Sequence, residues 1–195
     1  MPKGPKGFTE EEKATLRTKL CLECERSWAQ HGYKKTSIGE LTTKVGLSTG
    51  AFYLLYSAKE DLFYDTLQRM QDKLKKGIEN IIKSESGKIG FINVMKLHFQ
   101  KYDKAPVLYD LETPDFLAFL NKLPKECVEK LKLDSASIFH DVIKGTNLTL
   151  KVNEEKAYAL ISTLLYTVTI KGKINYDHHE IFEVLLINVV DSLFE

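Results

Sequence analysis

Apolar and polar residues follow one another along most of the chain with the period of an α-helix. The clearest example follows residue 57, where Leu62, Leu67, Met70 and Leu74 recur at helical spacing, which places apolar side chains on one face. From Leu148 to Val152 the residues favour a strand, but a lone short strand has nothing to pair with, so we expect a loop there. The pattern predicts an all-α fold, with helices near 9–30, 37–45, 49–55, 57–83, 88–103, 106–121, 124–144, 154–171 and 179–194.

Several of these helices have clear start signals. In a capping box, a serine or threonine and a glutamate three residues later satisfy each other's backbone N–H groups. The chain contains three capping boxes: Thr9 with Glu12, Ser37 with Glu40, and Ser57 with Glu60. Prolines at 106, 114 and 124 act as helix starters or breakers.

Two short helices lie close together between residues 37 and 55. The first is interrupted by Gly46, because glycine allows the positive φ that a tight corner requires. Ser48 then caps the second helix. Two short helices joined by a three-residue glycine turn form the helix-turn-helix pattern, whose second helix enters the major groove of DNA.

Over roughly residues 9 to 65 the chain resembles the TetR family of bacterial transcriptional regulators. The resemblance rests on Gly32-Tyr33, Thr36-Ser37, Gly46-Leu47-Ser48, Gly50, Phe52-Tyr53, Tyr56 and Lys59-Glu60-Asp61-Leu62. It implies an N-terminal three-helix helix-turn-helix domain and a C-terminal helical ligand-binding and dimerisation domain. We therefore expect a DNA-binding domain at 9–64 and a regulatory and dimerisation domain at 65–195. The prolines, lysines and glycines of residues 1–8 predict a flexible basic arm, with a frayed terminus that has no DNA contact as the alternative.

The second short helix has the side chains that base reading requires. Thr49 can donate or accept a hydrogen bond, Gly50 allows close approach, and Ala51 offers a methyl group to thymine. The resemblance places Tyr53 and Lys59 at phosphates. Residues near the ends of the first short helix complete the expected interface, although Ser37 can act as a cap alone and Lys44 as a solvated lysine. The expected DNA-binding residues are Thr36, Ser37, Thr43, Lys44, Ser48, Thr49, Gly50, Ala51, Tyr53 and Lys59.

Some positions depart from the family pattern. Thr42 and Val45 stand where the family mostly has alanine, so the packing between the two short helices is expected to be slightly wider. Leu54 and Leu55 stand where many members have His, Tyr or Arg. Base and phosphate readout therefore rests on fewer side chains, which leaves the operator sequence open.

Charge and cysteine content refine the picture. Twenty-eight basic and 27 acidic residues give a net charge of +1, but residues 31–59 hold four lysines against one glutamate, which suits DNA contact. Cys21 and Cys24 have zinc-like spacing without a second pair, so we interpret them as small core residues. Without an apolar run of the ~18–20 residues that span a membrane, or a signal-peptide core, we expect a cytoplasmic protein.

The C-terminal segment is expected to bind a small effector and a second copy of the chain. Aromatic and polar residues at helical spacing are candidates for lining an effector cavity: Phe91, Met95, His98, Phe99, Tyr102, Tyr109, Phe116, Phe119, Phe139, His140 and Tyr166. The last two helices carry an apolar stripe too wide for one neighbour, and the family pairs these helices between subunits. The expected dimer residues are Leu160, Leu164, Leu165, Val168, Phe182, Leu185, Leu186, Val189, Val190 and Leu193.

These features favour a homodimeric, sequence-specific DNA-binding regulator over the alternatives. The resemblance implies a repressor of a palindromic operator that a small ligand releases by moving the long helix, although an activator is also compatible. A ligand-independent architectural DNA-binding protein is the alternative. No phosphate loop, nucleophile elbow or HExxH motif indicates an enzyme, and no cofactor or metal site is expected, since His178 and His179 point apart at a helix start.

Overall fold

The computed structural model describes residues 7–105, 113–131, 135–173 and 175–195. The described residues fall into two compact units: unit 1 lies within Met1–Met70 and Asp110–Leu131, and unit 2 within Gln71–Tyr109 and Lys132–Glu195. The first junction is close to the predicted boundary at residue 65. Residues 113–131, which we assigned to 65–195, group with the helix-turn-helix segment in unit 1.

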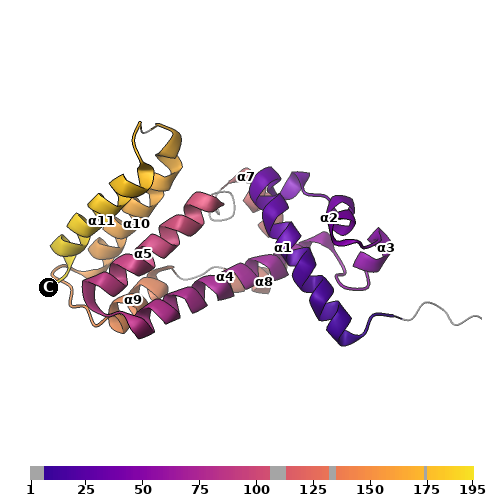
Figure 1. The fold of residues 1–195 in the computed structure, drawn as a ribbon, viewed down its shortest axis with the longest axis horizontal. Helices are drawn as coiled ribbons and strands as arrows, with labels where there is room; N and C mark the ends of the chain where they lie inside the picture. Colours follow the sequence, from indigo (N-terminus) through magenta and orange to yellow (C-terminus); the bar gives the residue numbers. More distant parts are fainter. Residues whose placement is uncertain (1–6, 106–112, 132–134, 174) are drawn as a thin grey trace, which may run out of the picture. The chain divides into compact units, whose positions relative to one another are not determined.

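Both units are built from helices (Figure 1), as the hydrophobic pattern predicts. The helices of unit 1 are α1 (Glu10–Lys35), α2 (Ile38–Val45), α3 (Thr49–Phe52), the beginning of α4 (Lys59–Ser84), α7 (Pro114–Leu120) and α8 (Lys125–Leu131). The helices of unit 2 are the rest of α4, α5 (Gly87–Lys104), α9 (Ser135–Gly145), α10 (Glu154–Tyr166), the 3-10 helix η1 (Thr167–Lys173) and α11 (His178–Leu193).

Of the three predicted capping boxes, one is complete and a second is present in part. The N–H of Thr9 donates to Glu12 Oε2 at 2.8 Å and the N–H of Glu12 donates to Thr9 Oγ1 at 3.2 Å, so this capping box is complete. Ser37 accepts from the N–H of Glu40 at 3.2 Å. The third start differs from the prediction, because the N–H of Ala58 donates to Asp61 Oδ2 at 3.0 Å.

The core of unit 1 is a cluster of aromatic rings around Trp28. Phe63 from α4 lies 4.7 Å from Trp28 between ring centroids, and Phe116 and Phe119 from α7 lie at 5.6 and 5.1 Å. All four side chains are at most 1% exposed. The cluster therefore fastens α7 to α1 and α4 within unit 1.

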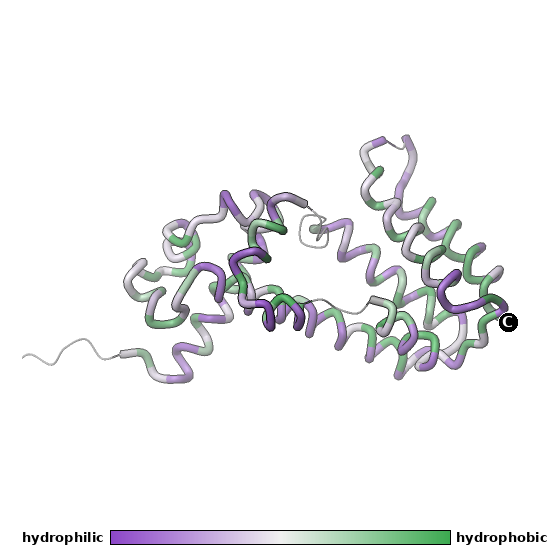
Figure 2. The backbone as a smooth tube through the Cα atoms, turned by 180° about the vertical axis from the view of Figure 1, so that it is seen from behind, coloured by the Kyte–Doolittle hydropathy of each residue, from purple (hydrophilic) through white to green (hydrophobic). Residues whose placement is uncertain are grey.

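Unit 2 has its own core, in which α10 and α11 lie side by side (Figure 1) and contact α5. Hydrophobic residues recur along these helices (Figure 2), and Phe99 stacks on Phe182 at 3.7 Å. Phe91 packs against Phe139 and Phe194 at 5.8 and 4.9 Å.

The predicted loop at residues 148–152 was wrong in one respect, because it has a pairing partner. Leu150 forms an isolated antiparallel bridge with Phe194. The N–H of Lys151 donates to the carbonyl of Leu193 at 2.8 Å, and the N–H of Glu195 to the carbonyl of Thr149 at 3.1 Å. The partner lies more than 40 residues away, so nothing in the local sequence indicates it.

Two predicted helices also have different ends. The helix expected over 154–171 changes to 3-10 geometry after Tyr166, and the helix expected over 124–144 corresponds to α8 and α9, on either side of residues 132–134. None of the described helices combines the length and the apolar character that membrane crossing requires.

Candidate nucleic-acid interface

The turn between α2 and α3 has the geometry that its glycine predicts. Gly46 adopts φ 74° and ψ 30°, the left-handed conformation in which a Cβ is unfavourable. The N–H of Leu47 donates back to the carbonyl of Thr42 at 2.8 Å. This hydrogen bond ends α2 and turns the chain into α3, which contacts α2.

Helix α3 is short, and its two faces differ. Ser48 caps it by accepting from the N–H of Ala51 at 3.1 Å. Phe52 is fully buried, and Leu55 and Tyr56 directly after the helix are 5% and 7% exposed. Thr49 and Gly50 are exposed, and the Tyr53 side chain is 57% exposed. The inner face thus holds α3 on the unit, while the outer face is free for a ligand.

Most of the predicted DNA-binding residues lie on exposed surface of α2, α3 and their caps. The exposed ones are Ser37, Thr43, Lys44, Ser48, Thr49, Gly50 and Tyr53, and Ala51 is half-buried. The predictions for the other two residues, Thr36 and Lys59, need correction.

Thr36 cannot offer its hydroxyl to a phosphate, contrary to the prediction. Its side chain is 1% exposed, and its Oγ1 donates to the carbonyl of Gly32 at 2.8 Å. The hydroxyl is used to satisfy a carbonyl at the end of α1, so Thr36 shapes the corner before α2.

Lys59 is the second correction, because its ammonium is already used inside the unit. Nζ donates to the carbonyl of Tyr33 at 2.6 Å and lies 4.3 and 5.2 Å from the ring centroids of Tyr33 and Phe63. Burial lowers the pKa of Lys59 from its ordinary value. Its ammonium stabilises the corner rather than projecting toward a phosphate.

A partly buried polar network, which the sequence pattern did not reveal, holds the chain just after α3. The Tyr56 hydroxyl donates to Asp65 Oδ2 at 2.5 Å, and Asp65 Oδ1 accepts from Arg69 Nε at 2.9 Å. Arg17 Nη2 donates to the carbonyl of Leu55 at 3.0 Å. The partners lie up to 38 residues apart in the sequence. Among these residues, only Tyr56 belonged to the pattern recognised in the sequence.

The adjacent leucines at 54 and 55, where the family often has polar residues, have opposite environments. Leu55 is 5% exposed and belongs to the core, whereas Leu54 is 62% exposed next to Tyr53. The loss of a polar group at 55 is thus explained by packing. Leu54 is an apolar group on the outer surface.

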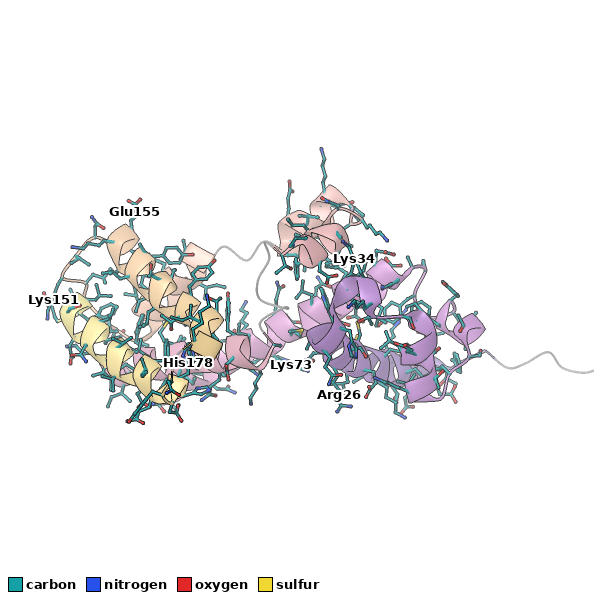
Figure 3. The ribbon with its side chains drawn as sticks, turned by 90° about the horizontal axis from the view of Figure 1, so that it is seen from above. Arg26, Lys34, Lys73, Lys151, Glu155 and His178 are labelled. Atoms are coloured by element: carbon teal, nitrogen blue, oxygen red, sulfur yellow. The ribbon has the colours of Figure 1, made fainter. Side chains whose placement is uncertain are left out.

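Lysines supply positive charge around this surface. Lys34 and Lys35 are exposed at the end of α1, where Figure 3 labels Lys34. Lys44 Nζ donates to Ser27 Oγ at 3.3 Å and lies 4.0 Å from Glu23 Oε2, yet its side chain is 49% exposed. Exposed lysines beside an exposed helix are suited to phosphate groups of DNA.

The predicted effector-lining residues do not form one group. Phe91, Met95, Phe99 and Phe139 lie together in the core of unit 2. His98 is half-buried in α5, where desolvation lowers its pKa to about 4, and Tyr102 packs against the core. The remaining predicted residues lie elsewhere: Phe116 and Phe119 in the core of unit 1, His140 and Tyr166 on exposed surface, and Tyr109 outside the described residues.

The predicted dimer residues divide into two groups. One group covers the core of unit 2 and is at most 7% exposed: Leu164, Val168, Phe182, Leu186, Val190 and Leu193. Leu165 and Val189 are intermediate, and Leu160 and Leu185 are 40% and 43% exposed. Only the exposed and intermediate residues are available to another chain, and Val184, at 55% exposed, joins them.

The adjacent histidines at the start of α11 point to different partners, as expected. His178, which Figure 3 labels, is buried, and its ring centroid lies 5.0 Å from that of Phe99. His179 Nε2 instead lies 3.1 Å from Asp103 Oδ2. Among the described residues no group of three His, Cys, Asp or Glu side chains is arranged to hold a metal ion. Cys21 and Cys24 are buried in α1, and burial raises the pKa of both thiols.

An exposed helix held on a second helix by a glycine turn, with lysines nearby, is the geometry of a helix-turn-helix DNA-binding domain. Residues 25–65 match the family described as bacterial regulatory proteins, tetR family. Residues 25–65 of this chain are therefore similar to the helix-turn-helix segment of the TetR family.

Comparisons over longer stretches agree. The chain is similar to the uncharacterized HTH-type transcriptional regulator YuxN of Bacillus subtilis, with 29% identity over 140 residues, 67% of this chain. That match spans 43% of the length of YuxN. The matched family and YuxN are both described as regulators of transcription.

Solved structures show that the fold extends along the chain. A TetR family transcription regulator from Marinobacter aquaeolei has a TM-score of 0.67 with 18% identity, covering 96% of this chain and all of that one. The regulator FadR from Bacillus subtilis, solved in complex with stearoyl-CoA, has a TM-score of 0.63 with 17% identity, covering 90% of this chain and 98% of that one.

Proposed function

We propose that the protein is a transcriptional regulator that binds an inverted-repeat operator as a homodimer and is released by a small ligand. The observation that carries the proposal is the exposed face of α3, with Thr49, Gly50 and Tyr53 outward and Phe52 buried, inside a segment that matches the TetR family. A recognition helix needs this division, because one face must anchor while the other reads DNA.

Some of the exposed residues are suited to contact bases and others to contact phosphates. Thr49 and Ala51 are suited to base edges, the first through its hydroxyl and the second through its methyl group. Ser37, Tyr53 and exposed lysines at the end of α1 are suited to phosphates, which fix register without reading sequence. Leu54 adds an apolar surface beside Tyr53 that is compatible with a thymine methyl group.

Regulation by a ligand would act through unit 2. FadR of Bacillus subtilis, a structural relative at low identity, binds stearoyl-CoA, so an acyl-CoA is a reasonable first probe of this chain. The proposed mechanism is a population shift. The ligand favours a state of the dimer whose two recognition helices no longer fit major grooves about 34 Å apart. The same scheme serves an activator, since the position of the operator sets the sign.

The proposed function is tested by selecting bound sequences from a random duplex pool with the purified protein at near-physiological salt. Enrichment of an inverted repeat supports a dimeric sequence reader. Weak, salt-sensitive binding without enrichment would instead support a ligand-independent architectural DNA-binding protein. Adding stearoyl-CoA to the selected complex then asks whether that compound releases the DNA.

Replacement of Thr49 by alanine is expected to relax sequence preference at one base pair of each half-site. The hydroxyl that we assign to a base edge is lost, and discrimination at that pair should fall by about 1–3 kcal/mol. The measurement is a repeat of the selection with the variant. An unchanged base preference at every position would refute the base-reading role of Thr49.

Replacement of Tyr53 by phenylalanine is expected to weaken binding to all DNA sequences alike. The 57% exposed side chain keeps its ring but loses the hydroxyl assigned to a phosphate, which costs about 0.5–1.5 kcal/mol. Affinity is measured on the selected operator and on unrelated duplex. A loss confined to the operator would contradict the phosphate assignment.

A further inference from the structure

Helix α7 packs in unit 1, although the chain on both sides of Asp110–Leu131 belongs to unit 2. Thr113 caps α7 by accepting from the N–H of Phe116 at 3.2 Å, and Pro114 occupies the first turn. The helix contacts α1. A segment remote in sequence is therefore part of the structural support of the helix-turn-helix.

The most specific contact of α7 is made by Asp115 with two backbone N–H groups of α1. Asp115 Oδ2 accepts from the N–H of Tyr33 at 2.5 Å, and Oδ1 accepts from the N–H of Lys34 at 3.1 Å. A break in a helix frees the N–H groups that follow it, as at a helix start. The carboxylate of Asp115 thus caps the last turn of α1 from another part of the chain, in the manner of an N-cap aspartate.

The break itself is at Gly32, which has φ 79° and ψ 170° within α1. A Cβ at this position would lie 2.7 Å from Asp115 Oδ2. Glycine is therefore required twice, for the positive φ and for the close approach of the carboxylate. This explains in physical terms why Gly32 precedes Tyr33 in this chain.

Tyr33 connects this corner to the start of α4. Its ring packs against Phe63 and Phe119 at 5.0 and 5.5 Å. Its hydroxyl donates to Glu60, which also pairs with Lys122 at 3.3 Å. Burial would raise the pKa of Glu60, but the hydrogen bond from Tyr33 and the nearby Lys122 hold it below its ordinary value.

We propose that Asp115 is a positioning residue for DNA recognition, fixing the Gly32–Lys34 corner so that α2 and α3 present their outer faces in one orientation. The inference rests on the proposed function. Only three residues separate Lys34 from Ile38, where α2 begins, and the Thr36 hydroxyl donates to the carbonyl of Gly32 in between. An error in the corner is therefore transmitted to α2 with little intervening chain to absorb it.

The test replaces Asp115 by asparagine, which keeps the side-chain shape but leaves one acceptor oxygen for two N–H groups. Affinity for the selected operator is expected to fall by about tenfold, because one of the two backbone N–H groups loses its charged acceptor. Binding to unrelated duplex should change by less than about twofold, because non-specific lysine contacts do not depend on register. Hydrogen exchange at Tyr33 and Lys34 should accelerate in the full-length variant.

Two further variants complete the test. Glu129→Gln changes the same charge at an exposed position of α8 and should leave the operator affinity and the exchange rates unaltered. Asp115→Ser keeps one acceptor on a shorter side chain and should lose at least as much operator affinity as Asp115→Asn. It serves as the test protein if the asparagine variant fails to fold.

The outcomes separate the two claims. An Asp115 variant that binds the operator as tightly as the parent chain would overturn the positioning role, and so would equal losses on operator and unrelated duplex. A parent chain that selects no operator would overturn the proposed function instead, whatever the exchange rates show.

Discussion

An aspartate in place of Leu185 is expected to convert the proposed homodimer into monomers. Leu185 is 43% exposed on α11, close to Val184 at 55%, and Leu160 on neighbouring α10 is 40% exposed. These side chains do not serve the core of unit 2, so they are the apolar surface available to a second copy. A carboxylate buried there without a partner costs several kcal/mol.

Sedimentation velocity of Leu185→Asp should show a monomer at concentrations where the parent chain is a dimer. Binding to the inverted repeat should fall by about 10²-fold or more, because two half-sites are no longer held by one linked reader. The matched control is Ile89→Asp, which places the same charge on α5. The side chain of Ile89 is the same size as that of leucine and is 69% exposed. A dimer that survives Leu185→Asp would place the subunit contact elsewhere.

Replacement of Trp28 by alanine should lower the free energy of unfolding of unit 1 by about 3–5 kcal/mol. Trp28 is fully buried and its ring contacts Phe63, Phe116 and Phe119. Removing it leaves a cavity where α1, α4 and α7 meet. Hydrogen exchange of the backbone N–H groups of α1, followed as a function of urea concentration, measures the loss in unit 1.

Trp28→Phe is the matched control and is expected to cost only about 1–2 kcal/mol. Most of the ring packing is retained, and the indole N–H, which has no hydrogen-bond acceptor in the described part of the chain, is removed. Equal losses for both variants would show that the size of the side chain does not govern the stability of this cluster.

The parts of the fold that were predicted from the sequence depend on local signals. The cap at Thr9, the left-handed turn at Gly46 and the cap at Ser48 each involve residues no more than five apart, and the structure has all three. The helices between them follow from periodicity. Such features are determined by backbone chemistry that neighbouring residues satisfy.

The features that were missed depend on distant partners. Asp115 lies 82 residues from Tyr33, and Leu150 lies 44 residues from Phe194. Lys59 was predicted to be a surface residue, because its acceptor, the carbonyl of Tyr33, lies 26 residues away in the sequence. Sequence pattern assigns a residue to a face of its helix, but not to a partner.

Periodicity also could not separate the residues that cover a helix's own unit from those left for another chain. Leu185 and Leu186 are adjacent and equally hydrophobic, yet they are 43% and 0% exposed. A stripe broader than one neighbour can cover indicates that both kinds exist. Only the orientation of α11 on α5 and α10 decides which residue belongs to which group.

The aromatic cluster of unit 1 also makes the protein its own optical reporter. Trp28 is the one tryptophan in the sequence and lies against Phe116 of α7. Its emission therefore records the environment of unit 1 alone, whereas circular dichroism averages over the helices of both units. Comparing the two signals during unfolding distinguishes independent units from a single cooperative one, without any dye or label.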